Sequence, residues 1–386
     1  MKGIYITDIL EATKEVPTSG VGKKIQGQIR AMEKGSIQCS LHCLRTHENT
    51  LLEKILMRFA VFGDGLDWTV TEEIRTAQFL YIRRPSFCSR QMIGFLRQVR
   101  QVNPSCKLLL EIPTYPYDVE YKTSLFWIPL LWQDRFWRRK LKRYLDRIVV
   151  LSNDREVFGI PTIHMENGVD LDRMPIKKQN ESDGISLCCA AQFSVWHGID
   201  RLLRGLAEYE SFPGEKREVH LYLAGEGPQS AELKKLTEAL GLQKVVTFCG
   251  RLTSRQLYEQ LFDRCDLGVE SLRKFCHSQG AMFSTLKSRE YLAVGLPFLY
   301  EGKVDVFEQE DVDFCFQVPS DETPVDIGAL ISFYDGLLQK ETKEQLSERI
   351  RVYAQDHVSW DKTFAGVIQW LKHCPAETQT KEEDTL

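Results

Sequence analysis

The sequence lacks several features that would place it in a common class of protein. No uninterrupted apolar run approaches the roughly 20 residues that a membrane-spanning helix needs. It contains neither a G-x-x-x-x-G-K-[ST] phosphate loop nor a G-x-G-x-x-G dinucleotide fingerprint. The formal net charge is only −4, so we expect no general affinity for nucleic acid, although local basic patches remain within that average.

An export signal and a regular cysteine spacing are also missing. Residues 1–7 enter a strand pattern directly, without the apolar region and cleavage site of a signal peptide. We therefore expect a cytoplasmic protein whose eleven cysteines stay reduced. Four potential metal ligands lie close together, but their segment alternates like a strand leading into a loop, and we expect no metal there: Cys39, His42, Cys43 and His47.

What the chain does contain is an alternation of strands and helices that occurs twice. Its 386 residues are enough for two domains, each with a core of its own. The first alternation begins with a strand at 3–7, and the second begins with a strand at 186–191. A polar segment at 177–183 separates them and has the composition of a linker. The pattern predicts two doubly wound α/β domains.

The most informative stretch is residues 284–297, a short helix with clear start and stop signals. Ser284 or Thr285 can accept a hydrogen bond from amides one turn ahead and so begin the helix. Gly295 followed by Pro297 is a typical helix end. We therefore expect a helix of about three turns.

Lys287 and Glu290 share one face near the start of this helix, because they are three residues apart. Free amides at a helix N-terminus together with a lysine can bind a diphosphate. A carboxylate one turn further on can accept hydrogen bonds from the vicinal hydroxyls of a ribose. The alternative is a solvated Lys/Glu face on an ordinary helix.

Two short motifs follow earlier strands of the second half. Gly225-Glu226-Gly227-Pro228 comes after the strand at 219–224, and Gly250-Arg251-Leu252 follows a strand at 245–248. A helix at 254–265 and a strand at 267–269 are expected next. The carboxyl ends of parallel strands meet at one edge of a sheet, where ligands bind. With Lys287 and Glu290, these motifs predict a nucleotide site. The backbone near Leu252 would face the base, and Arg251 would add a second cation.

In the first half, two segments lie at comparable positions. Residues 19–24 read Ser-Gly-Val-Gly-Lys-Lys, and we expect a glycine loop at Gly20 and Gly22 before a helix that begins near Ile25. Glu111 ends the buried strand 107–112 and is followed by Pro-Thr-Tyr-Pro-Tyr-Asp. These residues are placed for substrate contact. A tight turn and a structural, proline-rich turn are the alternatives.

Residues 126–143 combine aromatic residues with clustered bases. The aromatic side chains begin with Phe126 and Trp127 and end with Trp137, and six Lys or Arg residues are interleaved with them from Arg135 onward. This composition is typical of a helix that lies in the headgroup layer of an anionic membrane. The alternative is that the aromatic side chains pack inward while the bases are merely solvated.

Several of these segments resemble family 4 glycosyltransferases of the GT-B fold (glycosyl transferases group 1). Glu290, with Gly295 and Pro297 behind it, resembles the second half of the family's E-x7-E motif. Two further runs resemble bacterial members: Trp-His-Gly-Ile-Asp-Arg-Leu at 196–202 and Glu-Ile-Pro-Thr-Tyr-Pro-Tyr at 111–117. One departure stands out, since Met282 occupies the position of the motif's first glutamate.

The resemblance implies two Rossmann-like domains facing across a cleft. An acceptor-binding domain would span 1–175 and a nucleotide-sugar-binding domain 184–356. A helix at 357–372 would cross back to the first domain, and a tail at 373–386 would be disordered.

The resemblance also implies a transferase without a cofactor or metal, using a nucleotide-sugar donor, most simply UDP- or GDP-linked. The acceptor would be a glycan or a lipid-linked glycan in bacterial polysaccharide synthesis, reached from the inner face of the plasma membrane. Gly20 and Gly22 would lie under the donor sugar. Glu111, His197 and Lys287 are the candidate catalytic residues, with His197 donating to a phosphate or leaving group, or else satisfied structurally.

Two other functions remain open. Met282 favours a non-catalytic GT-B subunit that binds a glycan or a partner enzyme. An epimerase of the same fold, converting a nucleotide sugar without any acceptor, is the other. The stereochemical outcome of a transfer also stays open, because no carboxylate can be assigned to the donor sugar. Glu111, His277 and Gln279 are the other candidates for contact with that sugar.

Overall fold

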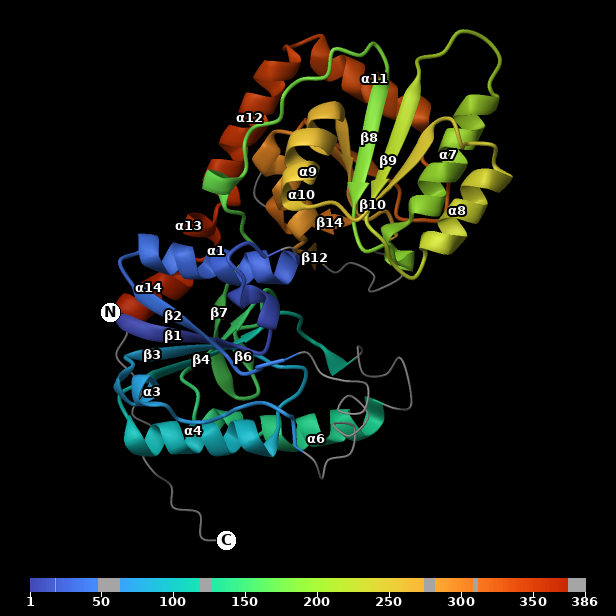
Figure 1. The fold of residues 1–386 in the computed structure, drawn as a ribbon. Coiled ribbons are helices and arrows are strands. Elements are labelled where there is room, and N and C mark those ends of the chain that lie inside the picture. Colours follow the sequence, from blue (N-terminus) through green and yellow to red (C-terminus); the bar gives the residue numbers. More distant parts are fainter. Residues whose placement is uncertain (18, 48–62, 119–126, 274–281, 308–311, 374–386) are drawn as a thin grey trace. The chain divides into compact units, whose positions relative to one another are not determined.

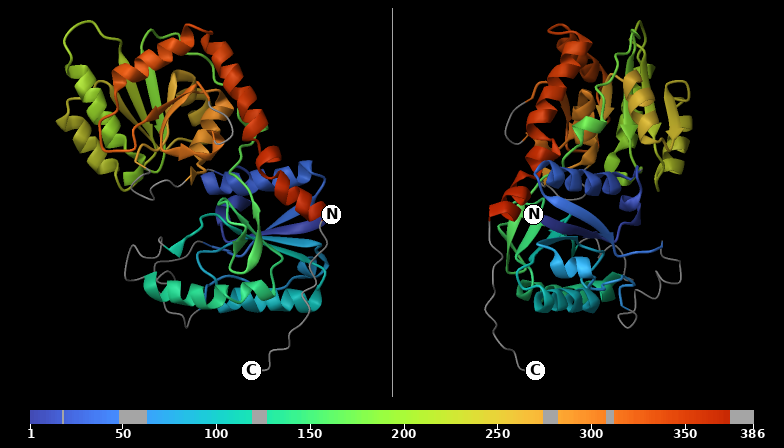
Figure 2. Two further views of the ribbon diagram at one scale, coloured as in Figure 1. Left: turned by 180° about the vertical axis from the view of Figure 1, so that it is seen from behind. Right: turned by 60° about the vertical axis from the view of Figure 1, so that its left-hand side comes forward.

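The computed structural model describes residues 1–17, 19–47, 63–118, 127–273, 282–307 and 312–373, and at 282 and 283 only the backbone. The chain divides into two compact units. The first consists of Met1–Gly168 together with Trp360–Leu386, and the second of Val169–Ser359. Each unit is a parallel sheet with helices around it (Figures 1 and 2). The predicted α/β class is therefore confirmed.

The sheet of the first unit has the strand order β2-β1-β3-β4-β5-β7-β6. All neighbours pair in parallel except β6, which runs antiparallel to β7. The chain order reverses between β1 and β3, which is where an open α/β sheet has its crevice. The strands are β1 (Lys2–Thr7), β2 (Gln38–Cys43), β3 (Phe79–Arg83), β4 (Lys107–Ile112), β5 (Arg147–Val150), β6 (Glu156–Val157) and β7 (Ile160–His164).

Helices cover both faces of this sheet (Figure 1). Alternate strand residues point to opposite faces, so Leu80 and Leu108 belong to the core under α4 and α6, whereas Tyr81 and Leu109 belong to the core with α1 and α14. The helices are α1 (Gly20–Lys34), α3 (Glu72–Thr76), α4 (Arg90–Val102), α6 (Ile128–Arg138), α13 (Trp360–Thr363) and α14 (Ala365–His373).

The C-terminal helices α13 and α14 belong to the first unit. Trp360, Phe364 and Val367 pack into the same core as α1. The Lys107 ammonium on β4 donates to the Leu371 carbonyl at 2.5 Å. These contacts complete the apolar face of the sheet next to α1.

The second unit repeats the plan with the strand order β10-β9-β8-β11-β13-β15, all parallel. The chain order reverses between β8 and β11. Its strands are β8 (Ile185–Ala190), β9 (Val219–Ala224), β10 (Val246–Gly250), β11 (Leu267–Val269), β13 (Phe298–Glu301) and β15 (Cys315–Val318), with a separate pair formed by β12 (Met282–Phe283) and β14 (Lys303–Val304).

The helices of the second unit share one large core with its sheet. Helix α7 packs against α8 and α11, and α10 packs against α12. The helices are α7 (Ile199–Ser211), α8 (Ser230–Ala239), α9 (Ser254–Gln256), α10 (Leu286–Val294), α11 (Ile327–Leu338) and α12 (Lys343–His357).

Two local predictions were wrong. The expected glycine loop at 19–24 is helical, because α1 begins at Gly20 and the Ser19 hydroxyl accepts from the Gly22 amide at 3.1 Å. The expected continuous helix at 254–265 is broken into α9, a π-helical turn at Leu257–Leu261 and a 3-10 turn at Phe262–Arg264. None of the helices in the described ranges combines the length and apolar character that crossing a bilayer requires.

Candidate active site

The carboxyl ends of β8 and β11 in the second unit are joined by the loops that follow them. The Leu272 amide donates to the His197 carbonyl at 3.0 Å, and the Arg273 amide donates to the Trp196 carbonyl at 3.1 Å. The reversal of strand order lies between these two strands, and open α/β sheets bind ligands at that point. The topology therefore directs attention to this edge of the second sheet.

Helix α10 begins beside the end of β11. Thr285 caps it, and its hydroxyl accepts from the Ser288 amide at 3.4 Å, so the predicted start is confirmed at Thr285 rather than Ser284. The Lys287 ammonium donates to the Ser271 hydroxyl at 3.1 Å and lies 4.0 Å from the Glu270 carboxylate. Lys287 is thus fixed against the strand end.

Glu270 is the residue here that the sequence analysis missed. It is fully buried, whereas the Lys287 side chain is 14% exposed. The opposite charges attract each other, so the buried carboxylate fixes the position of the Lys287 ammonium. Because Glu270 holds Lys287 in place, the lysine ammonium puts a positive charge at the partly exposed side of the strand end.

Glu290 lies one turn further along α10 and contacts a different element. The Tyr258 hydroxyl donates to the Glu290 carboxylate at 3.1 Å. Tyr258 belongs to the π-helical turn after α9. The two predicted ligand groups on α10 therefore each have a partner outside the helix.

The glycines after β9 are required by close backbone approach. A Cβ at Gly225 would lie 2.0 Å from the Ala191 carbonyl oxygen, and one at Gly227 would lie 2.3 Å from that of Phe193. Gly225 also has a φ of +120°, which other residues rarely adopt. These glycines let the loop after β9 pack directly on the loop after β8.

Arg251 and Leu252 lie next to this packed pair of loops. The Gly225 amide donates to the Gly250 carbonyl at 2.6 Å, which ties the loops after β9 and β10 together. Arg251 is 81% exposed and lies 3.3 Å from Glu226, itself 60% exposed. Leu252 is half-buried at the edge of the core.

His197 is held by its own short turn. Its Nδ1 accepts from the Ser194 amide at 3.0 Å. The ring is buried, and the following Gly198 is the N-cap of α7. A neutral His197 therefore carries its proton on Nε2, and the histidine closes the loop after β8 at the same time.

Two residues of the 196–202 run stabilise neighbouring loops. The two terminal nitrogens of Arg273 each donate to an oxygen of the Asp200 carboxylate at 2.7 Å. Arg273 also donates to the Glu322 carboxylate at 2.6 Å. The buried Arg201 donates to the Thr323 carbonyl at 2.8 Å and to the Pro319 carbonyl at 3.0 Å. The run thus fixes the loops after β8, β11 and β15.

In the first unit, Glu111 is the centre of a buried polar cluster rather than an exposed group. Its carboxylate lies 3.0 Å from the Lys24 ammonium and 2.5 Å from the Arg83 guanidinium. It also accepts from Tyr81 at 2.8 Å and from Gln28 at 3.0 Å. The Glu111 side chain is 0% exposed, so in this conformation it contacts protein groups on every side.

The electrostatic balance keeps Glu111 ionised. Burial raises the pKa of a carboxyl group, but Lys24, Arg83 and the Tyr81 hydroxyl outweigh burial and lower the pKa of Glu111 to about 2. Burial, followed by the negative charge of Glu111, raises the pKa of Tyr81 well above its ordinary value. Glu111 is therefore built as a permanent anion.

Lys24 is the partner that the sequence analysis passed over in favour of the neighbouring glycines. Because α1 begins at Gly20, Lys24 and Gln28 lie one turn apart on the helix face toward Glu111. Gly20 and Gly22 form the first turn of that helix. The 19–24 segment therefore delivers a lysine to the strand end.

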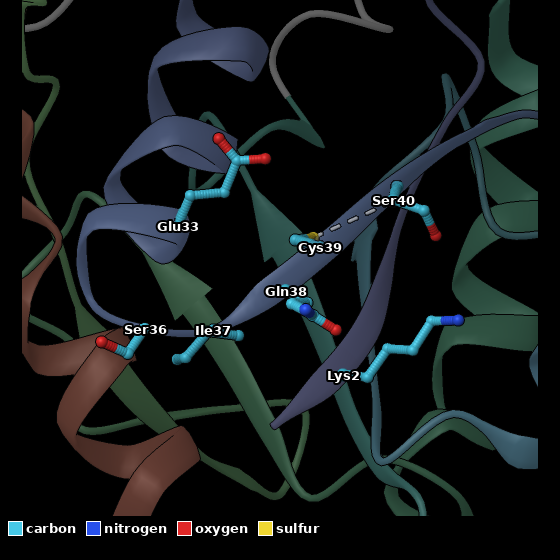
Figure 3. A pocket seen from close by; sticks show the side chains of 7 residues that line it. All are labelled: Lys2, Glu33, Ser36, Ile37, Gln38, Cys39 and Ser40. Carbon is cyan, nitrogen blue, oxygen red and sulfur yellow. Dashed lines mark hydrogen bonds between the residues drawn. The ribbon is translucent and has the colours of Figure 1, made fainter.

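A separate hollow lies at the opposite end of this sheet (Figure 3). It has a volume of about 530 Å³ and is lined by Lys2, Glu33, Ser36, Ile37, Gln38, Cys39 and Ser40. These residues lie at the amino ends of β1 and β2, in the last turn of α1 and in the connection from α1 to β2, whereas ligands of α/β sheets bind at carboxyl ends. Burial raises the pKa of the Cys39 thiol to about 12, which disfavours the reactive thiolate.

Three residues that the sequence analysis names lie in segments that the structure does not describe. His277 and Gln279, which the sequence suggests near the donor sugar, lie outside the described residues, as does Phe126. Within the described ranges, no group of three or more His, Cys, Asp or Glu side chains is placed to hold a metal ion.

Comparisons with known proteins give a family for part of the chain and a fold for nearly all of it. Residues 184–319 match the model of the family "Glycosyl transferases group 1". This part of the chain is therefore similar to the group 1 glycosyltransferases. The match covers the strand ends just described, from β8 to the loop after β15. The resemblance stated from the sequence is therefore confirmed.

Solved structures that are similar to this chain cover nearly its full length. Sucrose-phosphate synthase from Thermosynechococcus elongatus has a TM-score of 0.61 at 15% identity, covering 96% of this chain and 98% of its own. A glycosyltransferase from Rickettsia africae has a TM-score of 0.58 at 13% identity, and the match covers 97% of this chain and 99% of its own. HepE from Anabaena, in complex with UDP and glucose, has a TM-score of 0.57 at 13% identity, and the match covers 96% of this chain and 99% of its own. At these identities the likeness establishes the GT-B fold. No curated protein sequence matches the chain.

Proposed function

We propose that this protein transfers a sugar from a nucleotide-sugar donor to a glycan or lipid-linked acceptor. The observation that carries the proposal is the pair Lys287 and Glu290 on the first turns of α10, at the carboxyl edge of a group 1 glycosyltransferase domain. Lys287 and the first amides of α10 would bind the diphosphate. Glu290 would accept from the ribose hydroxyls.

The same groups supply the chemistry that transfer needs. Negative charge builds on the nucleoside diphosphate as the glycosidic bond breaks, and a fixed cation in a partly buried site stabilises that charge. Lys287 already lies against Glu270 and Ser271, so little reorganisation is needed when the leaving group forms. A buried His197 near the same strand end is a second donor to the phosphates.

The donor is proposed to be UDP- or GDP-linked. One HepE structure contains UDP and glucose, and another contains UDP-glucose. This favours the UDP-linked class for a chain of the same fold. The backbone at Leu252 would contact the base. Lys287 and Glu290 would thus bind the nucleotide part of the donor and leave the sugar to other groups.

A panel of UDP-, GDP-, ADP- and CDP-linked sugars in a thermal-shift assay tests the donor assignment. We expect one or two of them to raise the melting temperature, and Glu290→Ala to abolish that increase because the ribose contact is lost. Glu259→Ala is the matched control, since Glu259 is a half-exposed glutamate of the same unit that pairs with Arg255 in the adjacent turn. An unchanged shift in Glu290→Ala would contradict the ribose assignment.

We further propose that α6 contacts an anionic membrane, as a lipid-linked acceptor at the inner face of the plasma membrane would require. Trp132 is 70% exposed and Phe136 57% exposed on one side of the helix. Arg135 and Arg138 are already paired with Asp118 at 2.6 Å. Arg139, Lys142 and Arg143 follow the helix and are exposed, so they add positive charge near the aromatic side chains.

Co-sedimentation with phosphatidylcholine vesicles, with and without phosphatidylglycerol, tests the membrane contact. We expect binding only to the anionic vesicles at low salt, and loss of most of it in Trp132→Ala/Phe136→Ala because the apolar anchors are gone. Phe212→Ala is the control, as Phe212 is 70% exposed at the end of α7 in the other unit. Failure of the unchanged protein to bind anionic vesicles would refute this surface.

A non-catalytic subunit is the second candidate function, and Met282 is the observation that favours it. It stands where the family motif has its first glutamate. Incubation with the donor that binds best separates the two functions. A transferase releases some free sugar by slow hydrolysis, whereas a binding subunit releases none.

A further inference from the structure

Tyr258 reaches Glu290 from an element 32 residues earlier in the chain. Its hydroxyl donates to the Glu290 carboxylate at 3.1 Å. The Tyr258 ring packs against Phe262 with centroids 5.9 Å apart, and Phe262 in turn meets Tyr291 of α10 at 5.6 Å. Aromatic packing holds the ring, so the hydroxyl has a fixed position relative to α10.

The local backbone that carries Tyr258 is unusual. It lies in the π-helical turn Leu257–Leu261, directly after α9, whose first turn is fixed by reciprocal hydrogen bonds between Thr253 and Gln256. A π turn contains more residues than an α turn, so it redirects the side chains that it carries, and such turns recur at functional sites. The continuous α-helix expected from the sequence would have pointed Tyr258 elsewhere.

The bond suits a carboxylate that receives a ribose. A carboxylate has about four lone-pair positions, so one donor from Tyr258 fixes the plane of Glu290 while leaving capacity for the hydroxyls of a sugar. Burial, followed by the charge of Glu290, raises the pKa of Tyr258 above its ordinary value. The phenol therefore keeps its proton and remains a donor at neutral pH.

We propose that Tyr258 is a positioning residue that orients Glu290 toward the donor ribose and thereby sets the preference for ribonucleotides over deoxyribonucleotides. The inference rests on the proposed function, since it assumes that Glu290 accepts from the ribose. It adds a specificity determinant from an element outside α10. Tyr258 itself would not touch the nucleotide.

Isothermal titration with UDP and GDP and their 2′-deoxy counterparts tests this role. We expect the unchanged protein to bind the ribonucleotide more tightly than the deoxynucleotide. Tyr258→Phe should reduce that ratio by roughly 3- to 10-fold, mainly through weaker ribonucleotide binding. In a Glu290→Ala background, Tyr258→Phe should have no further effect on the ratio, because it acts through Glu290.

Tyr334→Phe is the matched control. The Tyr334 hydroxyl donates to the buried Asp266 carboxylate at 3.1 Å in the same unit, at the amino end of β11. It should cost similar stability and leave the ratio unchanged. An unchanged ratio in Tyr258→Phe, or an equal loss for both nucleotides, would overturn the inference. Absence of binding by the unchanged protein would instead overturn the proposed function.

If Tyr258→Phe lowers the melting temperature too far for titration, Tyr258→Trp and the Glu290→Gln variant give the same comparison. Glu290→Gln keeps an acceptor for Tyr258 but removes the charge. It should retain more of the ribose preference than Glu290→Ala does. The inference would also be overturned if both Glu290 variants lost the ribose preference equally and no Tyr258 substitution changed that preference.

Discussion

The two units place charged residues at the carboxyl ends of similar sheets, yet they use them differently. In the first unit, Glu111 is enclosed by Lys24, Arg83 and two other donors and has no exposed surface. In the second, Lys287 keeps 14% of its side chain exposed, and the buried Glu270 is 4.0 Å away. The first cluster is closed by its own partners, whereas the second presents a cation at its edge.

The difference indicates how to separate stability from ligand binding at equivalent positions. Cations that surround a carboxylate lower its pKa, and this interaction stabilises the fold. A lysine held by one buried carboxylate is positioned without being fully neutralised. We therefore expect substitutions at Glu111 to affect unfolding and those at Lys287 to affect nucleotide binding.

The largest effect should come from Glu111→Gln. Removing the charge leaves Lys24 and Arg83 buried beside a neutral amide, and breaking such a cluster costs about 3–5 kcal/mol of unfolding free energy. Urea unfolding followed by tryptophan fluorescence measures it. Nucleotide binding by the second unit should persist wherever the variant is folded. A loss of less than about 1 kcal/mol would show that Glu111 is not a structural anchor.

The pH dependence of stability gives the same contrast a second test. The pKa of Glu111 is about 2 when folded, against an ordinary value of 4.5. Its stabilising contribution is therefore present above about pH 4.5 and is lost as the pH falls toward 2, a change of about 3 kcal/mol. The difference in urea midpoint between the unchanged protein and Glu111→Gln should shrink over that interval. A constant difference would show that the charge of Glu111 has little part in it.

Much of the second unit could be predicted from the sequence. The strands at 219–224 and 267–269 and the end of α10 at Gly295 match the structure, because apolar periodicity and helix-stop signals are local. The partners of the site residues could not be predicted. Glu111 meets Arg83 only because β3 and β4 pair in a register that places the two side by side.

Other features depend on tertiary packing and were also missed. Helices α11 and α12 were not anticipated, although Thr342 and Gln345 form a capping box at the start of α12. The π-helical turn that carries Tyr258 replaces part of an expected α-helix, because packing of Phe262 against Tyr291 overrides local propensity. The polar segment at 177–183 packs on the second unit, with Lys177 buried.

A smaller effect is expected from Lys287→Met. Losing a charged contact to the diphosphate should weaken UDP or GDP binding by roughly 10- to 100-fold, while binding of the nucleoside alone changes little. Isothermal titration with the nucleotide and the nucleoside measures both. Lys343→Met is the matched control, because Lys343 pairs with the buried Asp266 at 2.9 Å at the other end of β11. Equal weakening by both variants would point to a general loss of structure.

The smallest effect should come from Arg251→Ala. Arg251 was predicted as a second cation for the diphosphate, but its side chain is 81% exposed and its ion pair with Glu226 lies in solvent. Exposed pairs contribute about 0–1 kcal/mol, because water and salt screen them and both side chains lose freedom. We therefore expect less than roughly a threefold change in nucleotide affinity, and a smaller one at high salt. Weakening by Arg251→Ala as large as that by Lys287→Met would mean that an exposed cation folds onto the ligand, and that burial beside a carboxylate is not what selects the diphosphate-binding lysine.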